Sequence, residues 1–261
     1  MACLQGTSGR GVIALLRTLL CCGPGLVLLS ACHDTSQDTA AADDPLTAQQ
    51  QTSANVLVAD VIVIGAGISG LSTAIVAAEN GFSVLVVDMA SVFGGTAVIS
   101  GGVLNIPVSP LQAGLNIEDS RELAIDDFLS WGEDADEPWV EYYVEHARTD
   151  IYDWTRSLGV EYVAAVTMPG NSVPRVHIPK GGGLALISAV YEEALRHEHI
   201  AFRFNTRAVE LITSGSRVAG VRTINTRSRS GQDLYAGSVV IATGGFQSNV
   251  ERVMPWVSMS L

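Results

Sequence analysis

The sequence has 261 residues, 48% of them hydrophobic, and its 27 acidic residues outnumber its 15 lysines and arginines to give a formal net charge of −12. This is the composition of a globular protein rather than a disordered chain. Nucleic acids and anionic lipid headgroups both bind clustered cations. The acidic balance and the single lysine, Lys180, therefore argue against both as partners.

The first 31 residues have the layout of a secretory leader. Arg10 and Arg17 precede an apolar run over residues 18–30, and Cys32 follows directly after Leu-Ser-Ala. The run is roughly 13 residues long, shorter than the ~20 that a membrane-spanning helix needs. The segment resembles a bacterial lipoprotein signal, which implies lipidation of Cys32 and an exported chain, anchored by lipid to a bacterial membrane at its periplasmic face or in the outer membrane. An uncleaved anchor is the alternative.

The remaining chain divides into a tether and a folded body. Residues 32–58 are rich in Thr, Gln, Ala, Ser and Asp, which predicts a flexible tether. Folded sequence is expected over residues 59–261. The body contains no cysteine, so no disulfide framework is expected in it. The lack of a histidine pair at ligand spacing on one helix likewise predicts no metal site.

The folded body opens with a strand, a glycine-rich turn, a helix and a second strand. The apolar run 61–64 is rich in β-branched residues and predicts a strand buried on both faces. Residues 65–70 read Gly-Ala-Gly-Ile-Ser-Gly, residues 71–80 predict a helix, and residues 83–87 predict a strand that ends in Asp88. The order predicts a dinucleotide-binding unit of a Rossmann-like α/β fold.

The three glycines of the turn and the aspartate after the second strand each have an expected role. Gly65 permits the tight turn, Gly67 lets backbone N–H groups approach a pyrophosphate, and Gly70 lets the helix pack closely on the strand. The helix N-terminus adds partial positive charge for the phosphates. Asp88 is expected to accept hydrogen bonds from the adenosine ribose hydroxyls.

Later glycine-rich pieces extend the pattern. Residues 94–96 read Gly-Gly-Thr, residues 100–102 read Ser-Gly-Gly, and residues 242–246 read Ala-Thr-Gly-Gly-Phe after another apolar run. With residues 205–211, these pieces resemble the flavoprotein family of fumarate reductases, succinate dehydrogenase flavoprotein subunits and 3-ketosteroid dehydrogenases. The resemblance implies a Rossmann-like FAD-binding domain with a parallel sheet, helices on its faces and a small β-hairpin excursion.

The resemblance also implies a cofactor site. Covalently flavinylated relatives carry a histidine at the position that aligns with Gly95, so noncovalent FAD is expected here. The candidate cofactor-binding residues are Gly65, Gly67, Ile68, Ser69, Gly70, Asp88, Met89, Gly95, Thr96, Gly101, Gly102, Val209, Ala242, Thr243 and Gly244.

The segments between these pieces predict mostly architecture. Asp119 and Glu122 fit a capping box at the start of a helix that reaches Trp131. A second helix is expected from residue 137 to residue 158. Residues 174–183 gather Arg, His and the single Lys beside three glycines, which suits either an anion-binding loop near the active site or a plain turn into the next helix.

The resemblance implies hydride transfer between flavin N5 and an activated carbon–carbon bond of a small substrate, with an unknown electron partner. Relatives continue well beyond the position that matches Gly244, whereas this sequence stops at Leu261. A domain truncated at its C-terminal end, without the capping domain, is therefore expected, and no catalytic residue is assigned. The alternatives are a non-catalytic FAD- or partner-binding module and an inactive fragment of a longer flavoenzyme.

Overall fold

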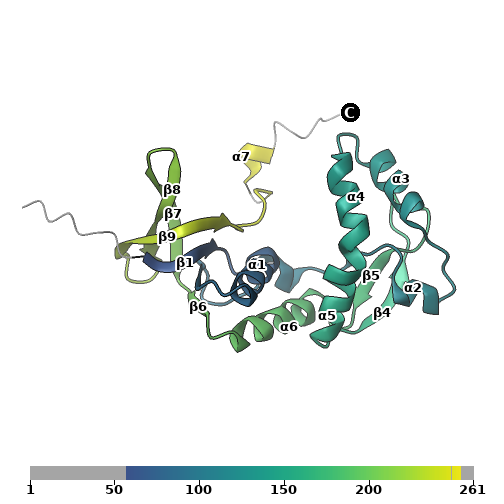
Figure 1. Cartoon of the computed structure of the whole chain (residues 1–261), viewed down its shortest axis with the longest axis horizontal. Helices are drawn as coiled ribbons and strands as arrows, with labels where there is room; N and C mark the ends of the chain where they lie inside the picture. The colour runs from purple at the N-terminus through teal and green to yellow at the C-terminus, as the bar shows by residue number, and fades with distance from the viewer. Residues whose placement is uncertain (1–56, 248, 254–261) are drawn as a thin grey trace, which may run out of the picture. The chain divides into compact units, whose positions relative to one another are not determined.

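The computed structural model describes residues 57–247 and 249–253, which fall within the unit Thr52–Leu261 of the chain. Its main sheet has six strands in the order β6-β2-β1-β9-β8-β7 (Figure 1). The strands are β1 (Leu57–Ile64), β2 (Val84–Val87), β6 (Ile200–Arg203), β7 (Thr206–Ser214), β8 (Arg217–Asn225) and β9 (Gly231–Ile241). The first four in sheet order pair in parallel, and β9, β8 and β7 pair as an antiparallel meander.

Helices α1 (Ile68–Glu79) and α6 (Gly182–Arg196) pack together against one face of the parallel strands (Figure 1). Ile75 of α1 and Ile187 of α6 are fully buried against Val86 of β2. The β-branched side chains of residues 62–64 in β1 and of Val84, Val86 and Val87 in β2 are buried on both faces, as expected of a parallel sheet. This core fixes the position of the turn that joins β1 to α1.

The antiparallel meander covers the other face of the parallel strands. Ile62 and Val87 of the parallel strands form a second core cluster with Val221 of β8 and Leu234 of β9. Register shifts interrupt the β7–β8 pairing, as β-bulges do where a sheet bends. The expected hairpin excursion is thus present as this meander.

A small antiparallel sheet, in the order β3-β5-β4, carries a group of helices around it (Figure 1). Its strands are β3 (Leu104–Asn105), β4 (Tyr162–Val166) and β5 (Val176–Pro179), and its helices are α2 (Pro110–Gly114), α3 (Arg121–Trp131), α4 (Glu137–His146) and α5 (Trp154–Ser157). A π-helical segment, η2 (Ala147–Asp153), joins α4 to α5, so the helix expected over residues 137–158 is interrupted. The short elements η1 (Gly95–Ile99) and α7 (Val250–Val253) complete the described chain.

The expected capping box at α3 is wrong. Ser120 is the N-cap residue, and its side chain accepts a hydrogen bond from the Leu123 N–H. The Asp119 carboxylate instead bonds to the guanidinium of Arg175. The Asp119 carboxylate therefore pairs with the buried Arg175 and does not cap the helix, although its position in the sequence had predicted a cap.

The leader over residues 1–31, Cys32 and nearly all of the expected tether lie outside the described residues. Strand β1 begins at Leu57, two residues before the expected start of the folded body. Across the described part of the chain, no helix combines the length and apolarity needed to cross a membrane. The same residues contain no group of three or more His, Cys, Asp or Glu side chains placed to hold a metal ion.

Candidate cofactor-binding site

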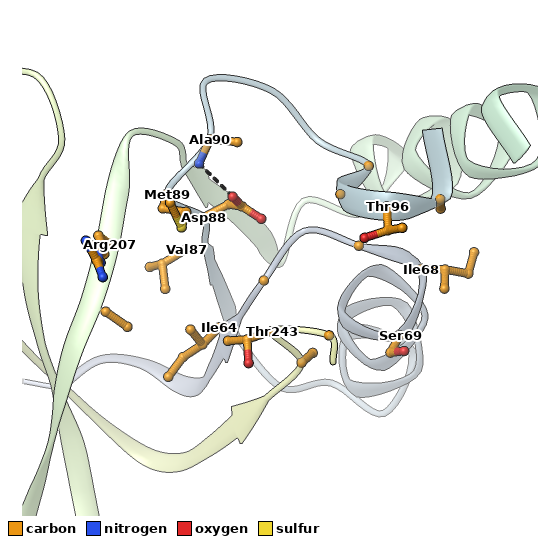
Figure 2. Close-up of a pocket in the computed structure, with 18 of the residues that line it drawn as sticks. Ile64, Ile68, Ser69, Val87, Asp88, Met89, Ala90, Thr96, Arg207 and Thr243 are labelled. Atoms are coloured by element: carbon orange, nitrogen blue, oxygen red, sulfur yellow. Dashed lines mark hydrogen bonds between the residues drawn. The ribbon is translucent and has the colours of Figure 1, made fainter. Parts of the chain in front are cut away.

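A cavity of about 520 Å³ opens at the carboxyl ends of β1, β2 and β9, beside the N-terminus of α1 (Figure 2). Open α/β sheets bind their ligands at this edge, where successive crossovers diverge. The volume lies within the usual range for small-molecule and cofactor sites. The lining residues are Ile64, Gly65, Gly67, Ile68, Ser69, Val87, Asp88, Met89, Ala90, Gly94, Gly95, Thr96, Ala97, Thr206, Arg207, Ala208, Ala242, Thr243 and Gly244.

The glycines of the first turn differ in what surrounds them. Gly65 has φ +113° and a Cβ there would lie 2.3 Å from the carbonyl oxygen of Ala242, so both conformation and space require glycine. A Cβ on Gly70 would lie 1.9 Å from the Gly65 carbonyl oxygen. A Cβ on Gly67 would meet nothing within 4 Å. Gly67 therefore keeps space free in the cavity, whereas Gly65 and Gly70 serve packing.

The N-terminus of α1 has features of an anion site. Gly67 is its N-cap residue, contributes no side-chain cap, and is followed by no acidic residue in the first turn. The first N–H groups of a helix have no partner within the helix, and they carry partial positive charge. The cavity end at Ile68 and Ser69 is therefore suited to phosphate.

Asp88 stands at the end of β2 with its carboxylate toward the cavity (Figure 2). Its Oδ2 accepts a hydrogen bond of 2.7 Å from the Ala66 N–H, and its Oδ1 accepts one of 2.7 Å from the Ala90 N–H. A carboxylate oxygen can accept more than one hydrogen bond. The two bonds fix the orientation of the group and leave acceptor capacity for hydroxyls of a ligand.

The loop over residues 174–183 does not gather free cations. Arg175 is fully buried and bonded to Asp119 and Asp127, and Lys180 pairs on the surface with Glu161 at 2.9 Å. His177 is also fully buried. Of the two interpretations of this loop, the structure favours the architectural one, because its charged groups are neutralised within the fold.

Hydrogen bonds assign a state to His177. Its Nδ1 lies 2.6 Å from the carbonyl oxygen of Arg175 and must therefore donate a proton. Its Nε2 lies 2.6 Å from Oγ of Ser109, whose hydroxyl can donate to it. Burial lowers the pKa of His177, and it outweighs the opposite effect of the bond to Arg175. The ring is held neutral as the Nδ1–H tautomer.

A family model for the FAD binding domain matches residues 60–258. The chain belongs to this family. A fumarate reductase (cytochrome) from Shewanella frigidimarina is 30% identical over 197 residues, which cover 74% of this chain and 34% of that protein. A KsdD-like steroid dehydrogenase from Mycolicibacterium smegmatis is 35% identical over 226 residues, 75% of this chain and 41% of that protein. The chain thus spans roughly a third to two fifths of the length of these relatives.

Solved structures give the same grouping. The open conformation of a flavocytochrome c3 fumarate reductase matches with a TM-score of 0.71 and 30% identity, over 78% of this chain and 36% of that one. The 3-ketosteroid-Δ4-(5α)-dehydrogenase from Rhodococcus jostii RHA1 matches with a TM-score of 0.69 and 25% identity, over 79% of this chain and 50% of that one. The chain is an FAD-binding member of an oxidoreductase family, and the Rossmann-like fold expected from its sequence is confirmed.

The residues present fit FAD, the cofactor of this family. The space beside Gly67 and the uncapped N-terminus of α1 suit the pyrophosphate, and Asp88 has acceptor capacity for ribose hydroxyls. The cavity extends to η1 on one side and to the start of β7 on the other. The cavity thus offers, in order, a site suited to phosphate, an acceptor for hydroxyls and apolar surfaces, and an elongated dinucleotide matches this order.

Eleven of the fifteen candidate cofactor residues line the cavity, and four do not. Gly70 lies behind the turn, against Gly65. A Cβ on Gly102 would lie 2.5 Å from the backbone N of Gly183, so the 101–102 pair sits against the start of α6. Val209 lies farther along β7, where it is exposed. These three glycines and one valine remain candidates through their backbone or their packing only.

Eight lining residues were not among the fifteen candidates: Ile64, Val87, Ala90, Gly94, Ala97, Thr206, Arg207 and Ala208. Four of them lie within the segments 94–96 and 205–211 that carry the family resemblance. Most directly adjoin a residue that was named, so widening each motif by one position would have found them. Arg207 adds the only cation among the described lining residues. Arg207 lies in the segment 205–211 that carries the family resemblance, but no role was predicted for its side chain. Its place in the cavity wall depends on β7 starting beside the end of β2.

Proposed function

We propose that the chain binds FAD noncovalently in this cavity and that the protein transfers hydride between the flavin and an activated carbon–carbon bond of a small substrate. The observation that carries the proposal is the pairing of the open space at Gly67 with the carboxylate of Asp88 in one cavity. Family membership over residues 60–258 supports it.

The chain's own residues would hold the cofactor in three ways. Backbone N–H groups at Ile68 and Ser69 would bind the pyrophosphate, and Asp88 would bind the ribose. Residues 94–97, which form the η1 end of the lining, would position the isoalloxazine side. Bound FAD supplies hydride chemistry at flavin N5, which no amino-acid side chain provides.

Noncovalent binding is supported by the chemistry of the wall. The described lining contains no histidine, cysteine or tyrosine, the side chains that usually link covalently to the flavin ring. Its ionisable residues are Asp88 and Arg207, both on the β2–β7 side rather than at η1. We therefore assign no catalytic acid or base to the described residues.

The substrate class is proposed from the relatives. One is a fumarate reductase, and another was solved with 4-androstene-3,17-dione. Both compounds carry a carbon–carbon double bond beside a carbonyl group. Because hydride addition needs an electron-withdrawing neighbour, we propose a substrate of this kind, with an electron partner that exchanges electrons with the flavin.

An absorption spectrum of the purified chain, before and after acid denaturation, tests the binding step. We expect flavin absorption in the native protein and about one equivalent of free flavin in the supernatant of the acid precipitate. Flavin retained by the precipitate would contradict noncovalent binding, and a folded but colourless protein that gains no flavin on incubation with FAD would overturn the proposal. Oxidation of reduced dye by fumarate or by the steroid then tests the reaction.

We also propose that Cys32 carries a lipid that attaches the exported chain to a bacterial membrane. Metabolic labelling with a radioactive fatty acid tests this. We expect label in the unaltered chain and none in Cys32→Ser, with the chain moving from the membrane to the soluble fraction.

A further inference from the structure

Arg207 lines the cavity at the end away from the N-terminus of α1. In Figure 2, Ser69 and Thr96 lie on one side, Asp88 and Met89 lie between, and Arg207 lies on the other side. The position of Arg207 is fixed by its neighbour, because the Thr206 N–H donates a 2.7 Å hydrogen bond to the carbonyl oxygen of Asp88. The start of β7 is thus tied directly to the end of β2.

Within residues 57–247 and 249–253, the guanidinium of Arg207 makes no hydrogen bond and no salt bridge. The other arginines in strands of the main sheet, Arg203, Arg217 and Arg222, each have such a partner. An unpaired cation in the wall of a cavity is available to a ligand.

The apolar side chain of Met89 faces the same end of the cavity and is 60% exposed. An exposed methionine and an unpaired arginine together form a surface that is apolar and cationic. Planar aromatic rings suit such a surface, because sulfur contacts aromatic rings favourably and guanidinium groups stack on them. A phosphate group would make no favourable contact with the apolar side chain of Met89.

The order of groups along a bound dinucleotide decides which ring lies there; this step rests on the proposed function. With the pyrophosphate at Ile68 and Ser69 and the ribose at Asp88, the base attached to that ribose extends away from α1. That direction leads to Met89 and Arg207 (Figure 2).

We propose that Arg207 is a specificity-determining residue that stacks its guanidinium on the adenine ring and so favours FAD over FMN. Cation–π contacts range from weak at exposed sites to several times stronger where water is excluded. Arg207 therefore acts on the adenine half of the cofactor and leaves the flavin half unchanged.

Titration of the flavin-free full chain with FAD, FMN and adenosine separates the halves. We expect Arg207→Ala to weaken FAD and adenosine by the same factor, between about two- and thirty-fold, and to leave FMN unchanged. Arg207→Lys should retain part of the affinity, because an ammonium keeps the charge but loses the planar stacking. Arg229→Ala is the matched control, since Arg229 is an exposed residue in the loop between β8 and β9, outside the cavity wall.

Several outcomes would overturn the proposal. Equal FAD affinity for Arg207→Ala and the unaltered chain would exclude the contact, while FAD binding itself would stand. A loss of FAD affinity in Arg207→Ala with unchanged adenosine affinity would show that Arg207 contacts a phosphate instead. An equal loss of affinity in Arg229→Ala would show that the effect comes from net charge. If the unaltered chain, shown folded by its thermal transition, does not bind FAD at all, the proposed function fails as well.

Discussion

Gly70 and Gly65 meet across the first turn so closely that a Cβ on Gly70 would lie 1.9 Å from the Gly65 carbonyl oxygen. Gly67, between them in sequence, has open space where its Cβ would stand. The three glycines of one motif therefore divide their work. Two let the helix pack against the turn, and the third keeps the cavity open.

Gly67→Val should abolish FAD binding while the fold persists. Gly67 has φ −82° and ψ −176°, an extended conformation that valine adopts, so the substitution adds bulk to the cavity without backbone strain. Valine is a poorer N-cap than glycine, which costs at most about 1 kcal/mol of helix stability. FAD titration and a thermal melt of the same preparation measure both effects.

Gly70→Ala is the matched control, and its main effect should be on the stability of the fold rather than on the space for FAD. Its new methyl group collides with backbone rather than with a flexible side chain, so we expect a loss of stability of ~1–3 kcal/mol or more. Tight FAD binding by Gly67→Val would contradict the assignment of the pyrophosphate site. An unchanged melting temperature for Gly70→Ala would contradict the packing role of Gly70.

Asp88→Asn should weaken FAD without unfolding the chain. The amide can still accept a hydrogen bond from the Ala66 or the Ala90 N–H, but its NH₂ group faces the other donor, and its charge is lost. Hydrogen bonds to charged groups contribute about 1.5–3 kcal/mol each, so we expect at least a tenfold rise in the dissociation constant. Asp88→Ala should be less stable than Asp88→Asn, because it leaves both N–H groups without an acceptor. Unchanged FAD affinity in Asp88→Asn would remove the ribose role.

The elements with local signals were predictable from the sequence. The turn over residues 65–70 was predicted because its glycines, its apolar strand and its terminal acid are all short-range features, and helix α3 has the expected end at Trp131. The helix after β1 begins at Ile68 rather than residue 71, because Gly67 serves as its N-cap. Patterns of this kind depend on backbone geometry over a few residues.

The small sheet and its buried charges could not be predicted in this way. Arg175 is bonded to Asp119 and Asp127, which lie 56 and 48 residues earlier in the chain. No local spacing encodes such a pair, so Asp119 was predicted to cap a helix, and the loop around Arg175 suited either an anion site or a plain turn. Residues 205–211 belong to the family resemblance, but the side chain of Arg207 was not predicted to line the cofactor site. Its position depends on the bond between the Thr206 N–H and the Asp88 carbonyl oxygen, which joins residues far apart in the chain.

Arg175→Met should destabilise the chain strongly. The guanidinium and the Asp119 carboxylate are 0% and 1% exposed, and removing the cation leaves two carboxylates without compensation. Breaking a buried pair in this way costs about 3–5 kcal/mol. Urea denaturation at pH 7 measures the loss. Lys180→Met, which breaks the exposed pair with Glu161, should leave stability unchanged and is the matched control.

The effect of Arg175→Met should shrink in acid. In the unaltered chain, burial alone would raise the pKa of Asp119, but hydrogen bonds from Arg175, Gln112 and Val108 outweigh it and lower that pKa. Its contribution to stability is therefore present above about pH 4 and is lost as the pH falls further. Without Arg175 the buried carboxylate takes up a proton at higher pH, which relieves the unpaired charge. A difference that stays constant from pH 7 to pH 4 would contradict this account.

His177 should give the chain a second, milder dependence on pH. Burial lowers the pKa of His177 below its ordinary value of 6.5, so the unfolded chain binds its proton first as the pH falls. The resulting stability is complete above about pH 6.5 and declines as the pH falls through the lowered pKa. Urea midpoints measured between pH 7 and pH 5 should therefore fall for the unaltered chain. His177→Gln should lower the midpoint at pH 7, since it disturbs the bonds to Arg175 and Ser109, but should flatten the slope. His199→Gln, at an exposed position, should keep the slope, and a slope that survives in His177→Gln would assign the proton to another group.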